Sequence, residues 1–396
     1  MKEHIPFGPA HILLPTEGFE KWASIACDQF TSQPEYWEKA MAIAGDAPSS
    51  LNLVLPEVYL ESGGNADDIA RINRCMEEYL AAGVFKEYKN AMILVERTLS
   101  TGKLRRGIVG AFELDSYSYE EGTKPLIRPT EGTVLSRIPP RVEIRRDAAV
   151  ELPHIMVLMD DRRKAVAEAV NTDRLQLLYD FELMLGGGHI KGWLIDEHEQ
   201  QRILSELEKL WEESGEEGDR LLFAVGDGNH SLATAKAAAP IIGSAESRRA
   251  LAELVNIHDE AVDFEPIYRV VFDADVEELL EDLHHAFPEA SGRRVDYMSL
   301  SAEGSVFVDG LESEVLQGFI DAYIAAHPGC RVDYIHGEAA TRELAMQENA
   351  VGFIFGGIGK DELFDYVRRN GILPRKTFSI GHAEDKRYYI EARKIR

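Results

Sequence analysis

Cysteine is scarce in this sequence, and the patterns that make it useful in disulfides or zinc sites are missing. Cys27, Cys75 and Cys330 lie far apart in a chain of 396 residues. They form no Cys-x-x-Cys pair and have no histidine at zinc-site spacing. An odd, scattered set of this kind is typical of reduced cysteines in the core of a cytosolic protein. The composition therefore argues against a disulfide scaffold and predicts a cytoplasmic location.

Positive charge and long apolar runs are also in short supply. The chain has 43 Lys and Arg against 69 Asp and Glu, a formal net charge of −26. Nucleic acids and anionic membranes repel such a surface, so we expect neither as a partner. The N-terminal segment lacks the apolar run of a signal peptide, and no window approaches the length of a membrane span. A local cluster of arginine can still bind phosphate.

Several catalytic signatures are missing as well. The sequence has no Gly-x-Ser-x-Gly nucleophile turn, no zinc-protease helix and no dinucleotide fingerprint. A glycine cluster at 356–360 follows an apolar strand, but it lacks the spacing and the hydroxyl residue of a nucleotide-binding P-loop. We interpret it as a turn.

The length and the pattern of apolar residues predict two domains. A chain of 396 residues exceeds the size at which a single core usually keeps growing. The apolar run at 51–55 predicts a short strand. From Ala91 onward strand patterns dominate, with hairpin turns at Thr101–Lys103 and at the glycines 186–188, whereas strands alternate with helices beyond Asp263. We therefore predict an α/β (α+β) protein with a mixed-sheet domain at 1–262 and a second α/β domain at 263–396. The basic tail of the second domain is able to fold back onto another part of the chain.

The richest local chemistry lies in LLFAVGDGNHSLATAKAAAP, residues 221–240. Five apolar residues predict a strand, and the alanine-rich part after the loop predicts a helix that Pro240 ends. Gly226 and Gly228 allow positive φ and a close backbone approach to a ligand. The N–H groups at the start of such a helix bind anions, most often phosphate.

Each polar residue of this loop has a structural and a functional interpretation. Asp227 either caps the helix and forms the turn or contacts a ligand or catalytic water. His230 is either a structural histidine or a proton donor and phosphate contact. Asn229 and Ser231, together with Gly228, are expected to contact phosphate or the backbone.

A second candidate segment is IRPTEGTVLSRIPPRVEIRRDA, residues 127–148, which is rich in arginine and contains three prolines. The prolines forbid a long helix, so we expect an irregular, surface-lining segment. Glu131 is our first choice for a general base, although a surface ion pair explains it equally well. The predicted phosphate-binding residues of this segment, with one lysine from the helix after the loop, are Arg128, Thr133, Arg137, Arg141 and Lys236.

Two aspartates end an apolar strand at 154–159. Asp160 and Asp161 could hold Mg²⁺ together with substrate phosphate oxygens, since this ion needs only one or two carboxylates. They could equally cap the structure that follows the strand. We carry both interpretations forward.

Several of these features occur together, in this order, in a known family. They are Glu96-Arg97-Thr98 at a strand end, GIVGAFELDSYSY at 107–119, the PTEGT segment at 129–133, the strand closing on Asp160-Asp161, and the Asp-Gly-x-His loop at 227–230. The sequence resembles the uncharacterised DUF1015 family, whose core is similar to the ParB/sulfiredoxin fold. The tail at 373–395 looks like a branch associated with genes of serine synthesis.

The resemblance implies a nucleotide or phosphate site. ParB/sulfiredoxin-like proteins include free-serine kinases and nucleotide-binding regulators, and their Asp-Gly-His-His-Arg loop lies at a nucleotide or phosphate that the arginine contacts. In this chain Ser231 replaces that arginine and Asn229 replaces the first histidine. An arginine from elsewhere, or Lys236, would have to neutralise the phosphate.

Two hypotheses follow. The chain is either an enzyme of phosphoryl transfer or phosphate-ester hydrolysis on a small polar metabolite, with serine or phosphoserine as first candidates, or a regulatory protein that binds a nucleotide or phosphometabolite without turnover. The resemblance suggests Mg²⁺ and ATP or ADP as cofactors. The enzyme hypothesis requires that the segment at 127–148 lie beside the loop at 226–231.

Overall fold

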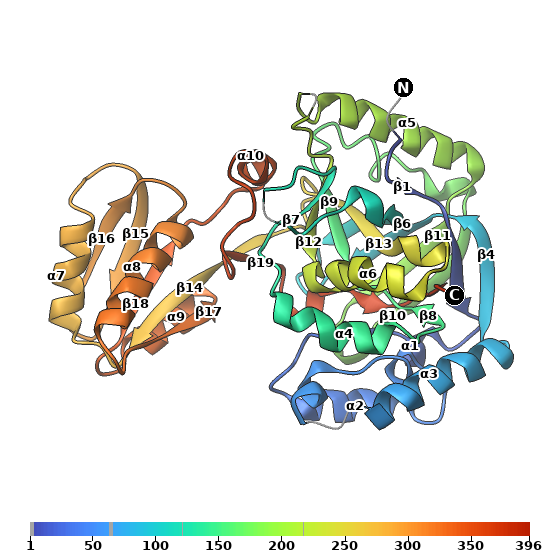
Figure 1. Cartoon of the computed structure of the whole chain (residues 1–396), viewed down its shortest axis with the longest axis horizontal. Coiled ribbons are helices and arrows are strands. Elements are labelled where there is room, and N and C mark those ends of the chain that lie inside the picture. The colour runs from blue at the N-terminus through green and yellow to red at the C-terminus, as the bar shows by residue number, and fades with distance from the viewer. Residues whose placement is uncertain (1–3, 63–65, 121, 217) are drawn as a thin grey trace. The chain divides into compact units, whose positions relative to one another are not determined.

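The computed structural model describes residues 4–62, 66–120, 122–216 and 218–396. The chain forms two compact units, one comprising Met1–Val262 with His382–Arg396 and the other Asp263–Gly381. Both contain helices and mixed or antiparallel sheets, which confirms the predicted α/β (α+β) class (Figure 1). The sequence assigned the tail to the second domain, but His382–Arg396 belongs to the first unit. Among the described residues, no helix is long and apolar enough to cross a membrane.

The first unit is built around a large mixed sheet. Its described strands follow the order β10-β11-β5-β6-β13-β9-β12-β7, and β1 also pairs with β6. The strands of this sheet are β1 (Phe7–Gly8), β5 (Ile93–Thr98), β6 (Leu104–Glu113), β7 (Ile127–Pro129), β9 (Met156–Met159), β10 (Gln176–Glu182), β11 (His189–Leu194), β12 (Phe223–Asp227) and β13 (Arg249–Asn256).

Smaller strand pairs join distant parts of the first unit. β2 pairs with β4, β3 with β20, and β8 with β21, so the tail adds strands to two N-terminal regions. These strands are β2 (Ala10–Pro15), β3 (Ser24–Ile25), β4 (Phe85–Ala91), β8 (Val150–Glu151), β20 (Tyr388–Tyr389) and β21 (Arg393–Lys394). The helices of the unit are α1 (Phe19–Trp22), α2 (Pro34–Ala44), α3 (Ala66–Ala81), α4 (Ile138–Arg145), α5 (Glu197–Glu213) and α6 (Asn229–Ile242).

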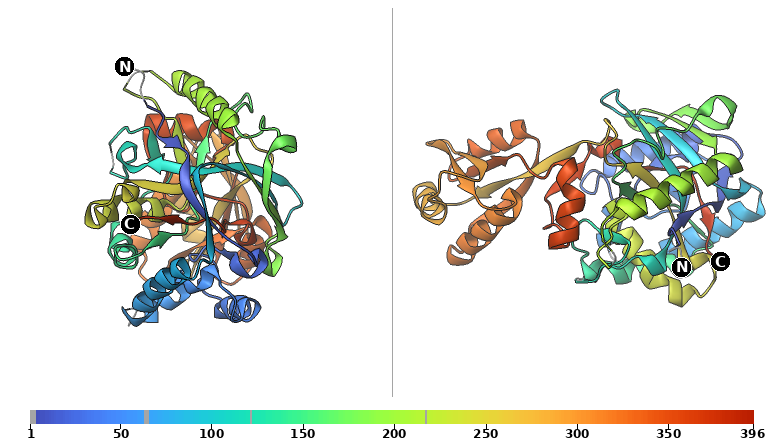
Figure 2. Two further views of the ribbon diagram at one scale, coloured as in Figure 1. Left: turned by 90° about the vertical axis from the view of Figure 1, so that its right-hand side faces the viewer. Right: turned by 90° about the horizontal axis from the view of Figure 1, so that it is seen from above.

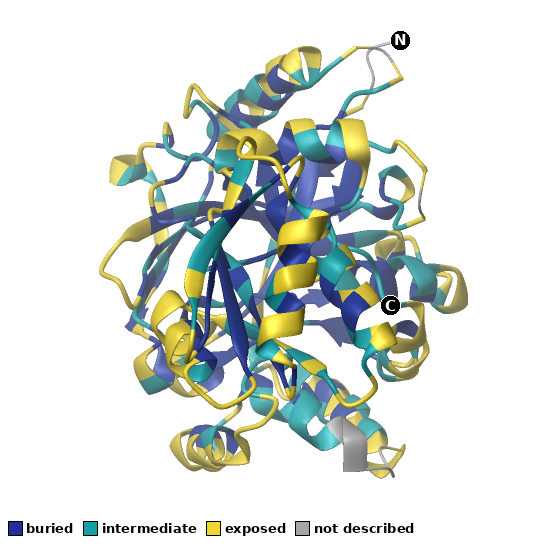
Figure 3. Cartoon of the chain, turned by 90° about the vertical axis from the view of Figure 1, so that its left-hand side faces the viewer, coloured by how far each residue is buried: buried dark blue, intermediate teal, exposed yellow. Residues whose placement is uncertain are grey.

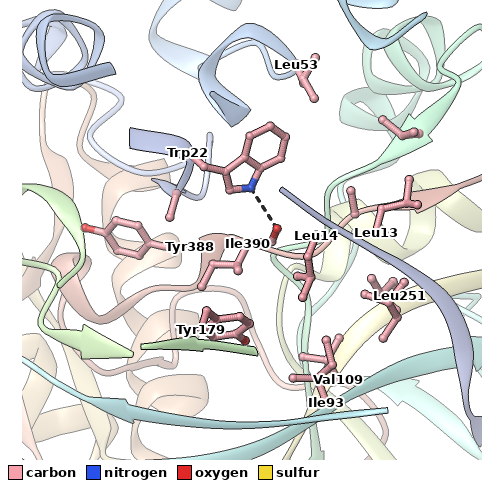
Figure 4. Close-up of a cluster of buried hydrophobic side chains, with 14 of the residues drawn as sticks. Leu13, Leu14, Trp22, Leu53, Ile93, Val109, Tyr179, Leu251, Tyr388 and Ile390 are labelled. Atoms are coloured by element: carbon pink, nitrogen blue, oxygen red, sulfur yellow. Dashed lines mark hydrogen bonds between the residues drawn. The ribbon is translucent and has the colours of Figure 1, made fainter. Parts of the chain in front are cut away.

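Apolar side chains cover both faces of this sheet, because successive residues of the central strands are apolar and point to opposite sides. On β5, Ile93 and Val95 pack into a core with α2, α3 and the tail, whereas Leu94 packs into a core with α5 and α6. Successive side chains of a strand point to opposite faces, so one strand supplies both cores. Figure 4 shows the first core, in which the Trp22 indole N–H donates to the Ile390 carbonyl at 3.0 Å. Figure 2 shows the helices on the two sides of the sheet.

The second unit is an antiparallel sheet with helices on both faces. The order of its described strands is β16-β15-β18-β14-β17, and β19 pairs with β14. Val271 of β14 packs toward α7 and α8, and its neighbour Val270 faces away from them. The elements are β14 (Phe264–Phe272), α7 (Val276–Ala286), β15 (Arg293–Met298), β16 (Glu303–Val308), α8 (Glu312–Ala326), β17 (Arg331–His336), α9 (Glu338–Ala345), β18 (Val351–Phe355), α10 (Lys360–Asn370) and β19 (Phe378–Ile380). In Figure 3 the helices carry exposed and buried residues on different sides, whereas central strands are largely buried.

Three local predictions were wrong for physical reasons. The apolar run at 51–55, predicted as a strand, begins with a 3-10 turn at Ser50–Asn52 that the Ser49 hydroxyl caps. α6 continues through Pro240 to Ile242 and ends at Gly243, which has φ 75° and ψ 2°. The proline-rich segment contains a short helix, α4, because Pro139 and Pro140 lie in its first turn, where the missing N–H groups need no helical acceptor.

Candidate functional site

The predicted strand, turn and helix at 221–240 form as β12, Gly228 and α6. Gly228 has φ 77° and ψ 27°, and a Cβ there would lie 3.0 Å from the Cα of Ile155. The turn therefore requires glycine both for its conformation and for space. The Gly228 N–H donates to Asp227 Oδ1 at 2.8 Å. Since the first N–H groups of a helix have no acceptor within it, the start of α6 remains suited to an anion.

The two predicted segments lie side by side, which confirms the contact that the enzyme hypothesis requires. β7 pairs with β12 in parallel, with Ala224 opposite Arg128, and α4 packs against α6 (Figure 1). The Thr130 hydroxyl donates to the Val225 carbonyl at 2.7 Å. The Val134 N–H donates to His230 Nε2 at 3.1 Å. His230 thus accepts a hydrogen bond at Nε2 and links the loop to the second segment.

A buried histidine that the sequence did not single out lies at the centre of the site. His154 precedes β9, which runs antiparallel to β12 with Met156 opposite Asp227. This pairing places His154 beside the start of α6, where its Nε2 lies 3.0 Å from Ser231 Oγ. The same Nε2 lies 3.5 Å from Asp28 Oδ2.

The C-terminal tail supplies the other side of this histidine. β20 pairs with β3, and the register sets Tyr389 opposite Ser24. The Tyr389 hydroxyl lies 2.9 Å from His154 Nδ1 and accepts a hydrogen bond from the Cys27 N–H at 3.1 Å. Both imidazole nitrogens therefore have defined partners, so the ring has a defined orientation.

Asp28 and His154 form an ionic pair. Burial by itself would lower the pKa of His154, but the neighbouring Asp28 carboxylate and its hydrogen bond raise it overall. Burial would likewise raise the pKa of Asp28, yet the His154 imidazole, Gln29 and Lys386 hold it well below its usual range. Burial and the Asp28 charge raise the pKa of the Cys27 thiol to about 12. Cys27 is therefore a neutral thiol at pH 7 and unsuited to nucleophilic attack.

Asp227 pairs with a lysine from the tail. Lys386 Nζ lies 3.2 Å from Asp227 Oδ2, and both side chains are mostly buried. Arg97 of β5 holds this part of the tail by donating to the carbonyls of Glu384, Asp385 and Lys386. The tail thus brings one cation and one phenol to the start of α6.

The predicted phosphate-binding residues are not gathered around the loop. Arg128 is buried and donates to the carbonyls of Pro125 and Arg220, which assigns it to holding β7 in place. Arg141 pairs with Glu57, and Arg137 is exposed. Lys236 donates to the Leu114 carbonyl at 2.6 Å. Glu131 and Thr133 are half-buried, and Asn229 is the first residue of α6.

The predicted metal ligands lie at the opposite end of β9 from His154. Asp160 lies six residues after His154, which at about 3.3 Å per residue of extended chain corresponds to about 20 Å. Both Asp161 carboxylate oxygens accept backbone N–H groups, from Arg163 at 3.2 Å and Val166 at 2.8 Å. Asp160 pairs with His258 and Arg162. These contacts favour the capping interpretation, in which Asp161 stabilises the turn after β9.

Metal-binding geometry is not evident elsewhere either. Across residues 4–62, 66–120, 122–216 and 218–396, no group of three or more His, Cys, Asp and Glu side chains is placed to hold a metal ion.

The sequence did not point to four residues of the site, which are Asp28, His154, Lys386 and Tyr389. The only local signal was that His154 comes directly before a buried strand. Its meeting with Ser231 depends on the antiparallel pairing of β9 and β12, and its meeting with Tyr389 on the pairing of β3 and β20. Neither pairing can be read from local periodicity.

Comparison with solved structures finds partial similarity to free serine kinases and to SbnI. A free serine kinase in complex with AMP has a TM-score of 0.40 at 14% identity, covering 72% of this chain and 91% of that chain. A mutant of a free serine kinase in complex with ADP gives 0.41 at 13%, covering 74% and 93%. SbnI with a C-terminal truncation, from Staphylococcus aureus, gives 0.37 at 11%, covering 69% and 82%.

A search of curated protein sequences finds no match to the chain. A family model matches residues 9–391, almost the whole sequence, and is described as a protein of unknown function. By this match, the chain belongs to the DUF1015 family.

Proposed function

We propose that the first unit transfers or hydrolyses a phosphoryl group on a small polar metabolite, with serine or phosphoserine as the first substrates to test. The observation that carries this proposal is the meeting of the Asp28–His154 pair with Ser231 in the first turn of α6. A ParB/sulfiredoxin-like core for this unit is part of the same proposal.

The proton-transfer chemistry rests on His154. An imidazole with partners on both nitrogens and a carboxylate 3.5 Å away is oriented to take a proton from a hydroxyl group and return it. Asp28, which lies at the same nitrogen as Ser231, would stabilise the charged form of the ring, and Tyr389 at Nδ1 would orient it. His230, which accepts from the Val134 N–H, is better suited to positioning the loop.

The phosphate would be held by the start of α6 and by Lys386. Helix N-terminal N–H groups and a lysine are common phosphate ligands. Lys386 already pairs with Asp227 at 3.2 Å, so a bound phosphate would share this lysine with the carboxylate. Ser231 stands where the resembling proteins have an arginine that contacts phosphate. In this chain Lys386 would take the place of that arginine.

A nucleotide, ATP or ADP, and Mg²⁺ fit this proposal as the phosphoryl donor and its counterion. Mg²⁺ takes one or two carboxylates together with phosphate oxygens, and Asp227 is the carboxylate beside the start of α6. When bound, the ion would neutralise phosphate charge. Asp160 and Asp161 follow the far end of β9, away from the start of α6, so they are not part of this proposed site.

The test uses a matched pair of histidine variants. The chain should be assayed with serine, phosphoserine, ATP, ADP and pyrophosphate, with and without Mg²⁺. We expect His154→Asn to lower turnover by about 100-fold or more, the usual scale for losing general acid–base catalysis. His258→Asn removes another histidine that pairs with an aspartate, at the other end of β9, and should leave turnover unchanged. Equal losses in both variants would contradict the proposal.

One observation favours a second function, a regulatory protein that binds a nucleotide or phosphometabolite without turnover. Arg141, expected to bind phosphate, pairs with Glu57 instead. This pairing reduces the positive charge available to a phosphoryl-transfer transition state. The alternative predicts that one of the same compounds raises the melting temperature while no product forms.

A further inference from the structure

The Ser231 hydroxyl has the surroundings of a nucleophile. Its oxygen lies 3.0 Å from His154 Nε2, within the range for a hydrogen bond between a nucleophile and its base. Tyr389 contacts the other ring nitrogen at 2.9 Å and keeps the imidazole directed at the serine. Asp28, 3.5 Å from Nε2, would stabilise the imidazolium that forms when the serine loses its proton.

The position of Ser231 in α6 favours phosphorus over carbon as the atom it attacks. Ser231 is the third residue of the helix, after Asn229 and His230. A phosphate on a serine in the first turn of a helix is stabilised by the helix dipole and the exposed N–H groups. A protonated His154 would add a charge-assisted hydrogen bond to that phosphate.

We propose that Ser231 is a covalent phosphoryl carrier, which takes the phosphoryl group from the donor and passes it to water or to a metabolite hydroxyl. This inference rests on the proposed function and adds a step to it.

The transfer through Ser231 takes two steps. First, Ser231 Oγ forms a bond to phosphorus and the bond from phosphorus to the donor oxygen breaks. His154 reacts in its neutral form: the serine proton moves to Nε2 and then to the departing oxygen. In the second step the acceptor hydroxyl gives its proton to His154 and bonds to phosphorus. The bond from phosphorus to Oγ breaks, and His154 returns the proton to Ser231.

The experiment is to trap the phosphorylated protein. The full chain is incubated separately with ATP, ADP, phosphoserine and acetyl phosphate, quenched in acid, and analysed by intact mass and peptide mapping. We expect one phosphoryl group on the peptide that begins α6. A parallel sample is quenched in denaturant at alkaline pH. Phosphoserine survives acid, whereas phosphohistidine does not, so a label seen only in the alkaline sample would point to His154 or His230 and overturn the assignment.

Three variants separate a covalent role from a structural one. Ser231→Ala should abolish the label, Ser231→Thr should retain part of it because a hydroxyl remains, and Ser136→Ala, at an exposed serine of the second segment, should label like the original protein. Melting temperatures show whether each variant folds. If Ser231→Ala does not fold, the label on Ser231→Thr decides whether the hydroxyl at this position carries the phosphoryl group.

The outcomes distinguish this inference from the proposed function. Label on Ser231 that is discharged by water or acceptor supports both. Turnover that survives in Ser231→Ala, or a label that is never discharged, overturns the covalent step and leaves the proposed function standing. Absence of both label and turnover with every donor overturns the two together.

Discussion

The Asp28–His154 pair makes a stability prediction that depends on pH. In Asp28→Asn the carboxylate is replaced by an amide of nearly the same shape, so His154 loses its counter-charge while the packing stays similar. At 3.5 Å and an effective dielectric constant of about 20, the Coulomb attraction is about 5 kcal/mol. The Asp28 side chain is 30% exposed, and solvent screening reduces this figure. We expect a loss of about 1–3 kcal/mol in the free energy of unfolding.

The two pKa shifts, of His154 and of Asp28, determine how the free energy of unfolding depends on pH. The raised pKa of His154 contributes stability that is complete below its ordinary value of 6.5 and lost as pH rises through the folded value. The lowered pKa of Asp28 contributes stability that is present above its ordinary value of 3.8 and lost as pH falls through the folded value. The difference between the original protein and Asp28→Asn should therefore be largest between these two ordinary values.

Urea unfolding followed by tryptophan fluorescence measures this difference in the first unit alone, because the four tryptophans of the chain, Trp22, Trp37, Trp193 and Trp211, all lie there. Asp46→Asn, at an exposed carboxylate, is the control and should change stability by less than about 0.5 kcal/mol. A loss in Asp28→Asn that is the same at pH 5 and at pH 9, about two units either side of neutrality, would refute the ionic pair.

Three further changes test the supports of the site. Gly228→Ala forces a side chain into positive φ and against Ile155, so we expect a loss of about 1–3 kcal/mol in the same unfolding assay; a smaller change would mean that the turn relaxes. Tyr389→Phe removes the hydroxyl between His154 and the Cys27 N–H and should cost about 1–3 kcal/mol, with an unchanged stability counting against that contact. Arg97→Met removes the guanidinium that binds three tail carbonyls, so limited proteolysis should cut the tail sooner than in the original protein; equal cutting rates would show that strand pairing alone holds it.

Local patterns were enough to predict many elements. The turn at Thr101–Lys103 joins β5 and β6, and the glycines at 186–188 join β10 and β11, because turn residues between two apolar runs determine a hairpin locally. The strand, glycine turn and helix around Gly228 were predictable for the same reason. The leucines at 51–55 misled us, since a short apolar run fits a buried turn as well as a strand.

The candidate site was only half predictable. Ser231 and Asp227 were singled out because they lie with glycines between a strand and a helix. The arginines were predicted to bind phosphate because several of them occur in one segment. In the structure, however, the buried Arg128 donates to backbone carbonyls and Arg141 forms an ion pair with Glu57. Buried charged side chains form hydrogen bonds or ion pairs within the protein. The composition of a segment does not show which of its arginines are engaged in this way.

The sequence by itself determined the two-part α/β organisation, the glycine turn before α6 and the serine that follows it, because these depend on backbone preference and apolar spacing among neighbours. Only the tertiary structure decided what surrounds that serine. His154 reaches Ser231 through the pairing of β9 with β12, and Tyr389 reaches His154 because the tail returns to pair with β3. Contacts between residues so far apart depend on the packing of the whole unit, and no local pattern encodes them.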